Sequence, residues 1–285
     1  MRYTIRDLVT YDEILQVHHL QREIWGLSEP MFGLYPPLIN TIAHNGGTVL
    51  GAFDAESGAM VAFLVGFLGR EKGGPLKLCS QAMGVRPEWR RHGVAQALKL
   101  AQRQRVIEQG LPLITWTYDP LEGPNATLNL HKLRAISRRY MPDVYGSNFG
   151  ALNAGLPTDR LLVEWWVRGE HLAQPMRPEL GAAVPIFELA SQGLERHIVD
   201  TRFDLQAESL LLETVADLHP VKAANLDLAL DWRLRVRAAF ETYFARGYLA
   251  TDFISMIDPA DGHRYNRYLL QKNNPLLRAK IGMID

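Results

Sequence analysis

Hydrophobic and polar residues alternate, or recur at helical spacing, through most of the first half of the chain. Alternation over 3–9 predicts a strand, and Ile14, Val17 and Leu20 fall at helical spacing within a predicted helix over 11–25. A short helix is predicted over 37–43. Runs of β-forming residues bounded by turn sequences predict further strands over 46–53, 59–69, 76–85, 111–118 and 160–167.

A longer helix is predicted between the strands over 76–85 and 111–118. Gly110 with Pro112 just beyond it is typical of a helix C-terminus. The buried stripe of this helix, at positions i, i+3, i+4 and i+7, consists of Val94, Ala97, Leu98 and Ala101. Another helix is predicted to begin near Asn125, with one face formed by Ala126, Leu130, Leu133 and Ile136.

The second half is predicted to begin a separate domain. Residues 171–184 mix proline, glycine and polar residues, so we expect one domain over 1–170 and an α+β domain over 171–285. The strands expected in the second domain lie near 185–189, 208–216, 248–257 and 263–270. A helix over about 226–246 should bury Trp232, Val236, Phe240 and Tyr243.

The composition restricts the partners and the compartment. Thirty-one Lys and Arg residues balance 31 Asp and Glu residues, so we expect neither nucleic acid nor a membrane as a partner. The single cysteine, Cys79, excludes an intramolecular disulfide and favours a reducing compartment. The sequence shows neither a signal-peptide pattern nor an apolar run of about 20 residues, and a cytoplasmic protein is expected. The nine histidines do not cluster at ligand spacing, so no metal site is expected.

One cationic turn, VRPEWRRHGVA over 85–95, stands where a predicted strand leads into the helix that carries Val94. Free amides at a helix N-terminus bind phosphate, because they carry the positive end of the helix dipole. Gly93 would allow the backbone to approach an anion closely, and Arg90 and Arg91 would add charge-assisted hydrogen bonds. The alternative is an ordinary turn, since this short pattern also arises by chance.

Strand, Arg90-x-x-Gly93-x-Ala95, helix and strand resemble the acyl-coenzyme A binding core of the GNAT superfamily of N-acyltransferases. The strings ITWTYDPL, NATLNLHKL and LPTDRLLVEWWV further resemble a bacterial subgroup of predicted GNAT acetyltransferases. The resemblance implies an α/β (α+β) fold with a mixed, mostly antiparallel central sheet flanked by helices. The C-terminal α+β extension repeats a strand–helix–strand order, which suggests a degenerate second GNAT-like half.

The resemblance also implies which residues hold the coenzyme. The pyrophosphate would be bound by Arg90 and by the amides of Arg91, His92, Gly93, Val94 and Ala95. The pantetheine arm would contact the backbone of Met83 and Val85 by strand addition. Asn125 and Asn129 are the candidates for a further contact, and Asn129 is preferred. The tyrosine that many members use as an acid is replaced by Leu130, and a glycine that usually follows is replaced by Arg134.

Candidate catalytic residues come from the chemistry that the reaction needs. An acceptor amine must be deprotonated before it attacks the thioester, and the departing thiolate needs a proton. Asp119, at the end of the strand over 111–118, is a candidate base or amine anchor; its alternative role is to cap an Asp-Pro turn. Tyr118 and Tyr140 are candidate acids, with packing in the core as their alternative role.

The expected function is transfer of an acetyl or succinyl group from coenzyme A to the amine of a small molecule, with an amino acid as a candidate acceptor. A non-catalytic protein that binds or senses acyl-CoA is the main alternative, and a structural protein with an empty cradle is the third. The extension over 171–285 would act as a lid, complete the acceptor site or form the contact of a homodimer. The sequence chooses neither the acyl group nor the acceptor.

Overall fold

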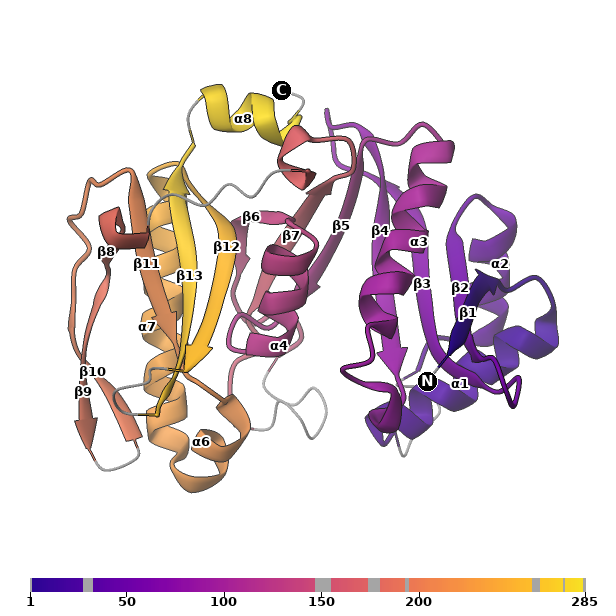
Figure 1. The fold of residues 1–285 in the computed structure, drawn as a ribbon, viewed down its shortest axis with the longest axis horizontal. Coiled ribbons are helices and arrows are strands. Elements are labelled where there is room, and N and C mark those ends of the chain that lie inside the picture. The colour runs from indigo at the N-terminus through magenta and orange to yellow at the C-terminus, as the bar shows by residue number, and fades with distance from the viewer. Residues whose placement is uncertain are drawn as a thin grey trace. The chain divides into compact units, whose positions relative to one another are not determined.

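The computed structural model describes residues 2–27, 33–146, 155–173, 180–192, 195–257, 262–273 and 275–283 (Figure 1). The chain divides into two compact units. The first unit consists of Met1–Trp116 with Trp166–Arg168, and the second of Thr117–Trp165 with Gly169–Met283. The domain boundary expected at residue 170 stays a prediction. No helix among the described residues has both the length and the apolar character needed to cross a membrane.

The first unit is built on a sheet with the strand order β1-β2-β3-β4-β5. Neighbouring strands are antiparallel except β4 and β5, which are parallel. The strands are β1 (Tyr3–Asp7), β2 (Thr48–Asp54), β3 (Met60–Arg70), β4 (Leu76–Val85) and β5 (Leu113–Tyr118). The helices are α1 (Tyr11–Trp25), α2 (Pro36–His44) and α3 (Val94–Glu108), with a short 3-10 turn over Pro87–Trp89.

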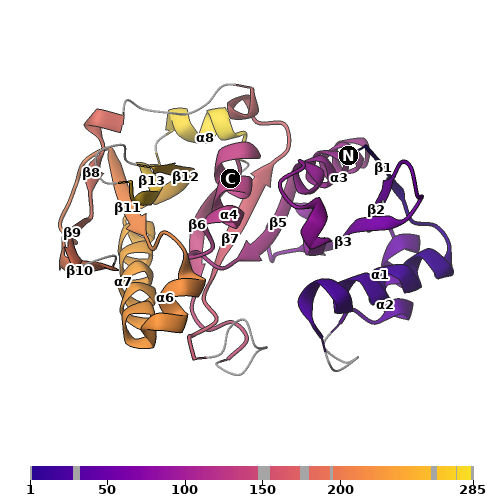
Figure 2. The same cartoon turned by 60° about the horizontal axis from the view of Figure 1, so that its bottom comes forward.

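Helices cover both faces of this sheet, with α1 and α2 on one face and α3 on the other (Figure 2). Successive residues of a strand point to opposite faces, so β2 and β3 are apolar at nearly every position. Val49 and Phe63 pack with α1 and α2. Leu50 and Leu64, one residue further along each strand, pack with Val94 and Leu98 of α3. The continuous apolar runs in the sequence therefore reflect a sheet that is buried on both sides.

The second unit contains a sheet with the order β7-β6-β12-β13-β11-β8 and a separate hairpin of β9 and β10. Its strands are β6 (Ile136–Met141), β7 (Arg160–Trp166), β8 (Val184–Pro185), β9 (Phe187–Gln192), β10 (Glu195–Thr201), β11 (Ser209–Thr214), β12 (Tyr248–Ile257) and β13 (Arg264–Lys272). Its helices are α4 (Gly123–Ala126), which continues as a π-helix over Thr127–Lys132, α6 (Leu218–Ala224), α7 (Leu226–Ala245) and α8 (Pro275–Ile281). Short 3-10 turns cover Glu170–Leu172 and Leu180–Ala182.

The expected fold class is confirmed: each unit carries a mostly antiparallel sheet with helices packed on it. The predicted buried face of α7 is also correct, since Trp232, Val236, Phe240 and Tyr243 are all buried. The degenerate second GNAT-like half stays a hypothesis. A sheet is present there, but β13 lies between β11 and β12, whereas β4 and β5 pair directly.

One predicted helix is too long. Ile136 lies on β6, because the helix that begins at Gly123 ends at Lys132. Two amides close this end, from Leu133 to the carbonyl of Leu128 and from Ala135 to that of Asn129. Arg134 then adopts a left-handed conformation with φ of 55°, which turns the chain out of the helix. The prediction was wrong for Ile136 because this residue falls by coincidence at helical spacing from Leu133, although it is the first residue of β6.

Candidate functional site

The cationic turn between β4 and α3 has the shape of an anion cradle. It begins with the turn over Pro87–Trp89, which is anchored by the buried indole of Trp89. Arg91 and Gly93 both have left-handed backbones, with φ of 65° and 80°. Gly93 is the N-cap of α3, and it offers no side chain to cap the helix. These two reversals bring the chain into the first turn of α3.

The amides of this cradle are available to a ligand. Among the described residues, none accepts a hydrogen bond from the backbone N–H groups of Arg91 through Gln96. The first hydrogen bond of the helix runs from the amide of Ala97 to the carbonyl of Gly93. Arg91, His92 and Gly93 are exposed. Six consecutive donors at the positive end of a 15-residue helix therefore remain for an anion.

The arginine side chains of the cradle differ in their roles. The Nε atom of Arg90 donates to the carbonyl of Val85 at 3.3 Å, so part of this guanidinium holds the end of β4. Arg91 makes no side-chain hydrogen bond or ion pair with any described residue. If an anion binds here, only the Nη groups of Arg90 are left to contact it. The whole guanidinium group of Arg91 is available.

The end of β4 that leads into the cradle has one open backbone edge. The amide of Arg86 donates to the carbonyl of Val61, which identifies the hydrogen-bonded pairs of the β3–β4 ladder. In an antiparallel ladder these pairs alternate with non-bonded ones. Met83 and Val85 occupy the non-bonded positions, opposite Leu64 and Ala62, so their N–H and C=O groups point away from β3. The two residues predicted to meet the pantetheine arm are thus the ones whose backbone groups face away from β3, although the Val85 carbonyl already accepts from Arg90.

The described pairing of β4 with β5 is short. It consists of Leu78 with Ile114 and Cys79 with Thr115, both near the beginning of β4. A bulge follows at Gln81, because Ser80 pairs with Gly66 and Ala82 pairs with Val65. A bulge bends and twists its strand. The second half of β4 therefore leaves its parallel neighbour and exposes the edge that carries Met83 and Val85.

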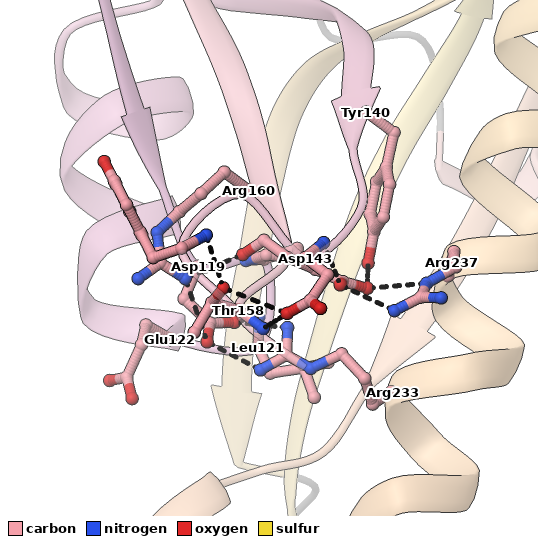
Figure 3. A network of polar contacts seen from close by, with 12 residues as sticks. Asp119, Leu121, Glu122, Tyr140, Asp143, Thr158, Arg160, Arg233 and Arg237 are labelled. Carbon is pink, nitrogen blue, oxygen red and sulfur yellow. Dashed lines mark hydrogen bonds and ion pairs between the residues drawn. The ribbon is translucent and has the colours of Figure 1, made fainter. Parts of the chain in front are cut away.

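All three predicted catalytic residues lie in the second unit, and two of them, Asp119 and Tyr140, belong to a polar network (Figure 3). Both carboxylate oxygens of Asp119 accept from Arg233, Oδ1 from Nη1 at 2.7 Å and Oδ2 from Nη2 at 2.6 Å. Oδ1 also accepts from the amide of Leu121 at 2.9 Å, which is the turn-capping role considered as the alternative for Asp119. The Arg233 side chain is only 1% exposed.

A second carboxylate in the network holds Tyr140. The Tyr140 hydroxyl donates to Oδ2 of Asp159 at 2.7 Å, and Arg237 binds both oxygens of Asp159 at 2.7 and 2.8 Å (Figure 3). Burial, followed by the charge of Asp159, raises the pKa of Tyr140 well above its usual value. The phenol is therefore neutral at physiological pH, and its proton is directed at Asp159.

Tyr118 is equally enclosed. Its hydroxyl lies 3.1 Å from that of Tyr268, which in turn donates to the carbonyl of Pro120 at 2.7 Å. Burial raises the pKa of Tyr118 above its usual value. Both candidate acids thus have partners for their hydroxyl groups, as expected for core tyrosines. The catalytic roles predicted for Asp119, Tyr118 and Tyr140 stay predictions.

Two predicted positions on the helix after β5 are buried. Asn129 is 4% exposed, and its carbonyl accepts from the amide of Ala135 at 3.0 Å. Leu130, which the resemblance places where many GNAT proteins are expected to have a tyrosine, is 1% exposed. Among the described residues, no three His, Cys, Asp or Glu side chains come together in a way that could hold a metal ion.

The sequence analysis missed Asp159, Arg233 and Arg237 as members of the network. A signal was present, because the two arginines are spaced i, i+4 and flank the apolar stripe of α7. Arginine beside a buried helix face indicates a buried carboxylate partner. Which carboxylates these arginines bind depends on the packing of α7 against distant loops, and spacing along the chain does not reveal it.

Comparison with known proteins finds no matching family model and no matching curated protein. Solved structures do match. The ribosomal-protein-S18-alanine N-acetyltransferase from Escherichia coli is 12% identical over 57% of this chain and 92% of its own, with a TM-score of 0.45. A GNAT superfamily phosphinothricin acetyltransferase from Sinorhizobium meliloti, in complex with AcCoA, is 18% identical over 57% and 88%, with a TM-score of 0.46. A putative acetyltransferase from Salmonella typhimurium with acetyl-CoA is 14% identical over 63% and 99%, with a TM-score of 0.47. Similarity at this level concerns the fold alone.

Proposed function

We propose that this protein binds an acyl-coenzyme A at the cradle between β4 and α3 and transfers the acyl group to the amine of a small molecule. The observation that carries the proposal is the set of unpaired amides from Arg91 to Gln96. A diphosphate presents several acceptor oxygens, and backbone N–H groups at a helix N-terminus bind such a group without a long side chain. Arg91 adds an exposed positive charge.

The same strand that ends in the cradle suits the rest of the coenzyme. A pantetheine arm contains two amide groups, and it would pair with the N–H and C=O groups of Met83 and with the N–H group of Val85 as an added strand. Neither the binding of the diphosphate by the amides nor the pairing of the pantetheine arm with β4 needs a particular side chain. Asn129 is proposed as a further contact on the strength of the resemblance alone.

Transfer would begin when the acceptor nitrogen, as the free base, attacks the thioester carbonyl. Holding the two reactants together supplies much of the acceleration, since bound reactants behave as if present at very high concentration. We propose Asp119 as an anchor for the acceptor amine. Its Oδ2 atom accepts one strong hydrogen bond, from Arg233, and the Nη1 atom of Arg160, at 3.8 Å, is too far to form a second. The acid roles of Tyr118 and Tyr140 stay predictions from the sequence, and both hydroxyls already have partners within the protein.

A non-catalytic acyl-CoA sensor is the second candidate function. It is favoured by one observation, the buried Leu130 at the position of the usual acid. The two candidates differ in whether acyl-CoA is consumed. Release of free thiol from acetyl-CoA and succinyl-CoA across a panel of amino acids and other amines identifies the enzyme, and binding without turnover for any amine identifies the sensor.

The cradle itself is tested by substitution of Gly93 with glutamate, measured by isothermal titration with CoA. The side chain would place a negative charge beside the amides, and we expect at least a hundredfold loss of affinity. Gly58 is the matched control, because it also has a positive φ, of 71°, and open space around the position of a Cβ atom. Gly58→Glu carries the same backbone strain and should bind CoA normally. Normal binding by a folded Gly93→Glu variant would exclude the cradle.

A further inference from the structure

Lys99 occupies the point where β4 and β5 separate. The last described ladder pair is Cys79 with Thr115, and the next residues on the two strands are Ser80 and Trp116. The Nζ atom of Lys99, on α3, donates to the Ser80 hydroxyl at 2.8 Å and lies 3.7 Å from the centre of the Trp116 ring. We call Ser80, Lys99 and Trp116 the fork residues. One amine thus contacts both strands at the place where they part.

This amine is buried without an anionic partner. Lys99 is 2% exposed, and no described carboxylate forms an ion pair with it. Its remaining hydrogen bond goes to Oε1 of Gln102, at 3.4 Å. Buried lysine is rare unless paired, because an ammonium group loses its hydration there. Nothing in the packing of the sheet requires it, since an apolar side chain of similar volume would fill the same space.

The charged and titratable groups near Lys99 have other partners. On β4, Lys77 pairs with Glu71 at 2.6 Å, and on α3 the Nε atom of Arg103 donates to the carbonyl of Val167 at 2.8 Å. Cys79 is the titratable neighbour of Ser80 on β4, and β5 contributes the neutral Thr115 and Trp116. Desolvation therefore acts alone on Lys99, and it lowers the pKa of the amine to about 7.

We propose that Lys99 and Ser80 form a proton-donor pair for the thiolate that leaves the acyl-CoA. This inference rests on the proposed function. A pantetheine arm that follows the open edge of β4 runs from the cradle past Val85 and Met83 toward Ser80. Six strand residues span about 17 Å, so the arm would bring its thioester to the fork. Lys99 acts through Ser80, so it is a positioning and proton-supplying residue rather than a group that touches the substrate.

The acceptor nitrogen attacks the thioester carbonyl, a C–N bond forms, and the C–S bond breaks with its electron pair going to sulfur. The thiolate takes the hydroxyl proton of Ser80, and Ser80 takes a proton from the Lys99 ammonium. The acceptor nitrogen loses one proton to solvent, and Lys99 regains one from solvent. A thiol with a pKa of about 8.5 holds the proton better than an amine with a pKa near 7, so the transfer is downhill.

The test compares kcat of the wild-type protein and of Lys99→Met as pH is varied, at saturating acyl-CoA and acceptor. Titration of the acceptor affects both proteins equally and cancels in the ratio of the two kcat values. We expect a ratio of about 100 below pH 7, the usual contribution of a general acid, and a steady fall above pH 7 as Lys99 loses its proton. Ser80→Ala should show the same pattern. Lys72→Met, at an exposed lysine on the turn before β4, is the control and should match the wild type.

Two further measurements separate the proton role from a structural one. CoA affinity and the urea midpoint of Lys99→Met should equal or exceed those of the wild type, because methionine fills the site without a buried charge. Lys99→Arg keeps a cation that does not release its proton near neutral pH, and it should be as slow as Lys99→Met. A kcat ratio that does not change with pH, or an active Lys99→Arg variant, would refute the proposed proton-donor role of Lys99 and Ser80. Acyl transfer by the wild type would still support the proposed function in that case. A wild type that transfers no acyl group refutes both.

Discussion

Asp119 and Arg233 are 114 positions apart in the sequence and are joined by two parallel hydrogen bonds of 2.6 and 2.7 Å. The Arg233 side chain is almost completely buried, while Asp119 is 12% exposed. The pair connects the turn after β5 to the buried side of α7 within the second unit. Bidentate pairs of this kind are strong and directional. The carboxylate predicted as a catalytic base is therefore also a structural anchor.

We expect Arg233→Met to lower the free energy of unfolding by about 3 kcal/mol, because the Asp119 carboxylate then loses its bidentate partner and keeps only Arg160, whose Nη1 atom lies 3.8 Å from Oδ2. The double variant Arg233→Met with Asp119→Asn should recover much of this loss, since residue 119 then carries no charge that has lost its bidentate partner. Urea denaturation of the two variants gives the comparison. If the double variant folds but transfers no acyl group, Asp119 has a role in catalysis as well.

The control for this prediction lies on the same helix. Arg235 and Asp231 form an i, i+4 pair at 2.8 Å with side chains about 40% exposed. Such surface pairs contribute a few tenths of a kcal/mol, so Arg235→Met should change stability by less than about 0.5 kcal/mol. Equal effects of the two methionine variants would contradict the importance given to the buried pair.

Arg91→Gly separates the backbone of the cradle from its side chain. Arginine at φ of 65° is strained, and glycine adopts this conformation readily, so stability should rise by up to about 1 kcal/mol. CoA affinity should fall no more than tenfold, because the amides stay in place and only one exposed charge is lost. Arg91→Ala should lose the same affinity without the gain in stability. A hundredfold loss in both variants would show that side chains, not amides, provide the binding.

Glu13 should make the first unit sensitive to acid. Desolvation acts to raise its pKa, but hydrogen bonds from the amides of Thr10 and Val9 and from Arg6 outweigh it and lower the pKa from 4.5 to about 2. The folded state thus favours the ionised carboxylate. This contribution to stability is present above pH 4.5 and is lost as the pH falls toward 2.

The comparison for this prediction is Glu13→Gln, which keeps a hydrogen-bond acceptor in the capping box of α1 but does not ionise. The wild type should be the more stable protein at pH 6, and the difference in unfolding free energy should shrink below pH 4. A difference that stays constant from pH 6 to pH 2.5 would show that the charge of Glu13 does not contribute.

The sequence by itself determined the elements of the first unit and the position of the cradle. Runs of β-forming residues predicted β2 and β3, and the helical spacing of Ile14, Val17 and Leu20 predicted α1. The glycine turn before Val94 located the helix N-terminus. These features are local, because they depend on residues a few positions apart, and local rules of spacing and capping are sufficient to read them.

Only the tertiary structure decided how the polar groups are partnered. The pairing of Asp119 with Arg233, the position of β13 between β11 and β12, and the burial of Lys99 where β4 leaves β5 all join segments far apart in the chain. In the sequence Lys99 is an ordinary polar residue in an amphipathic helix. Its environment depends on where two strands separate, and that follows from long-range packing and the bulge at Gln81.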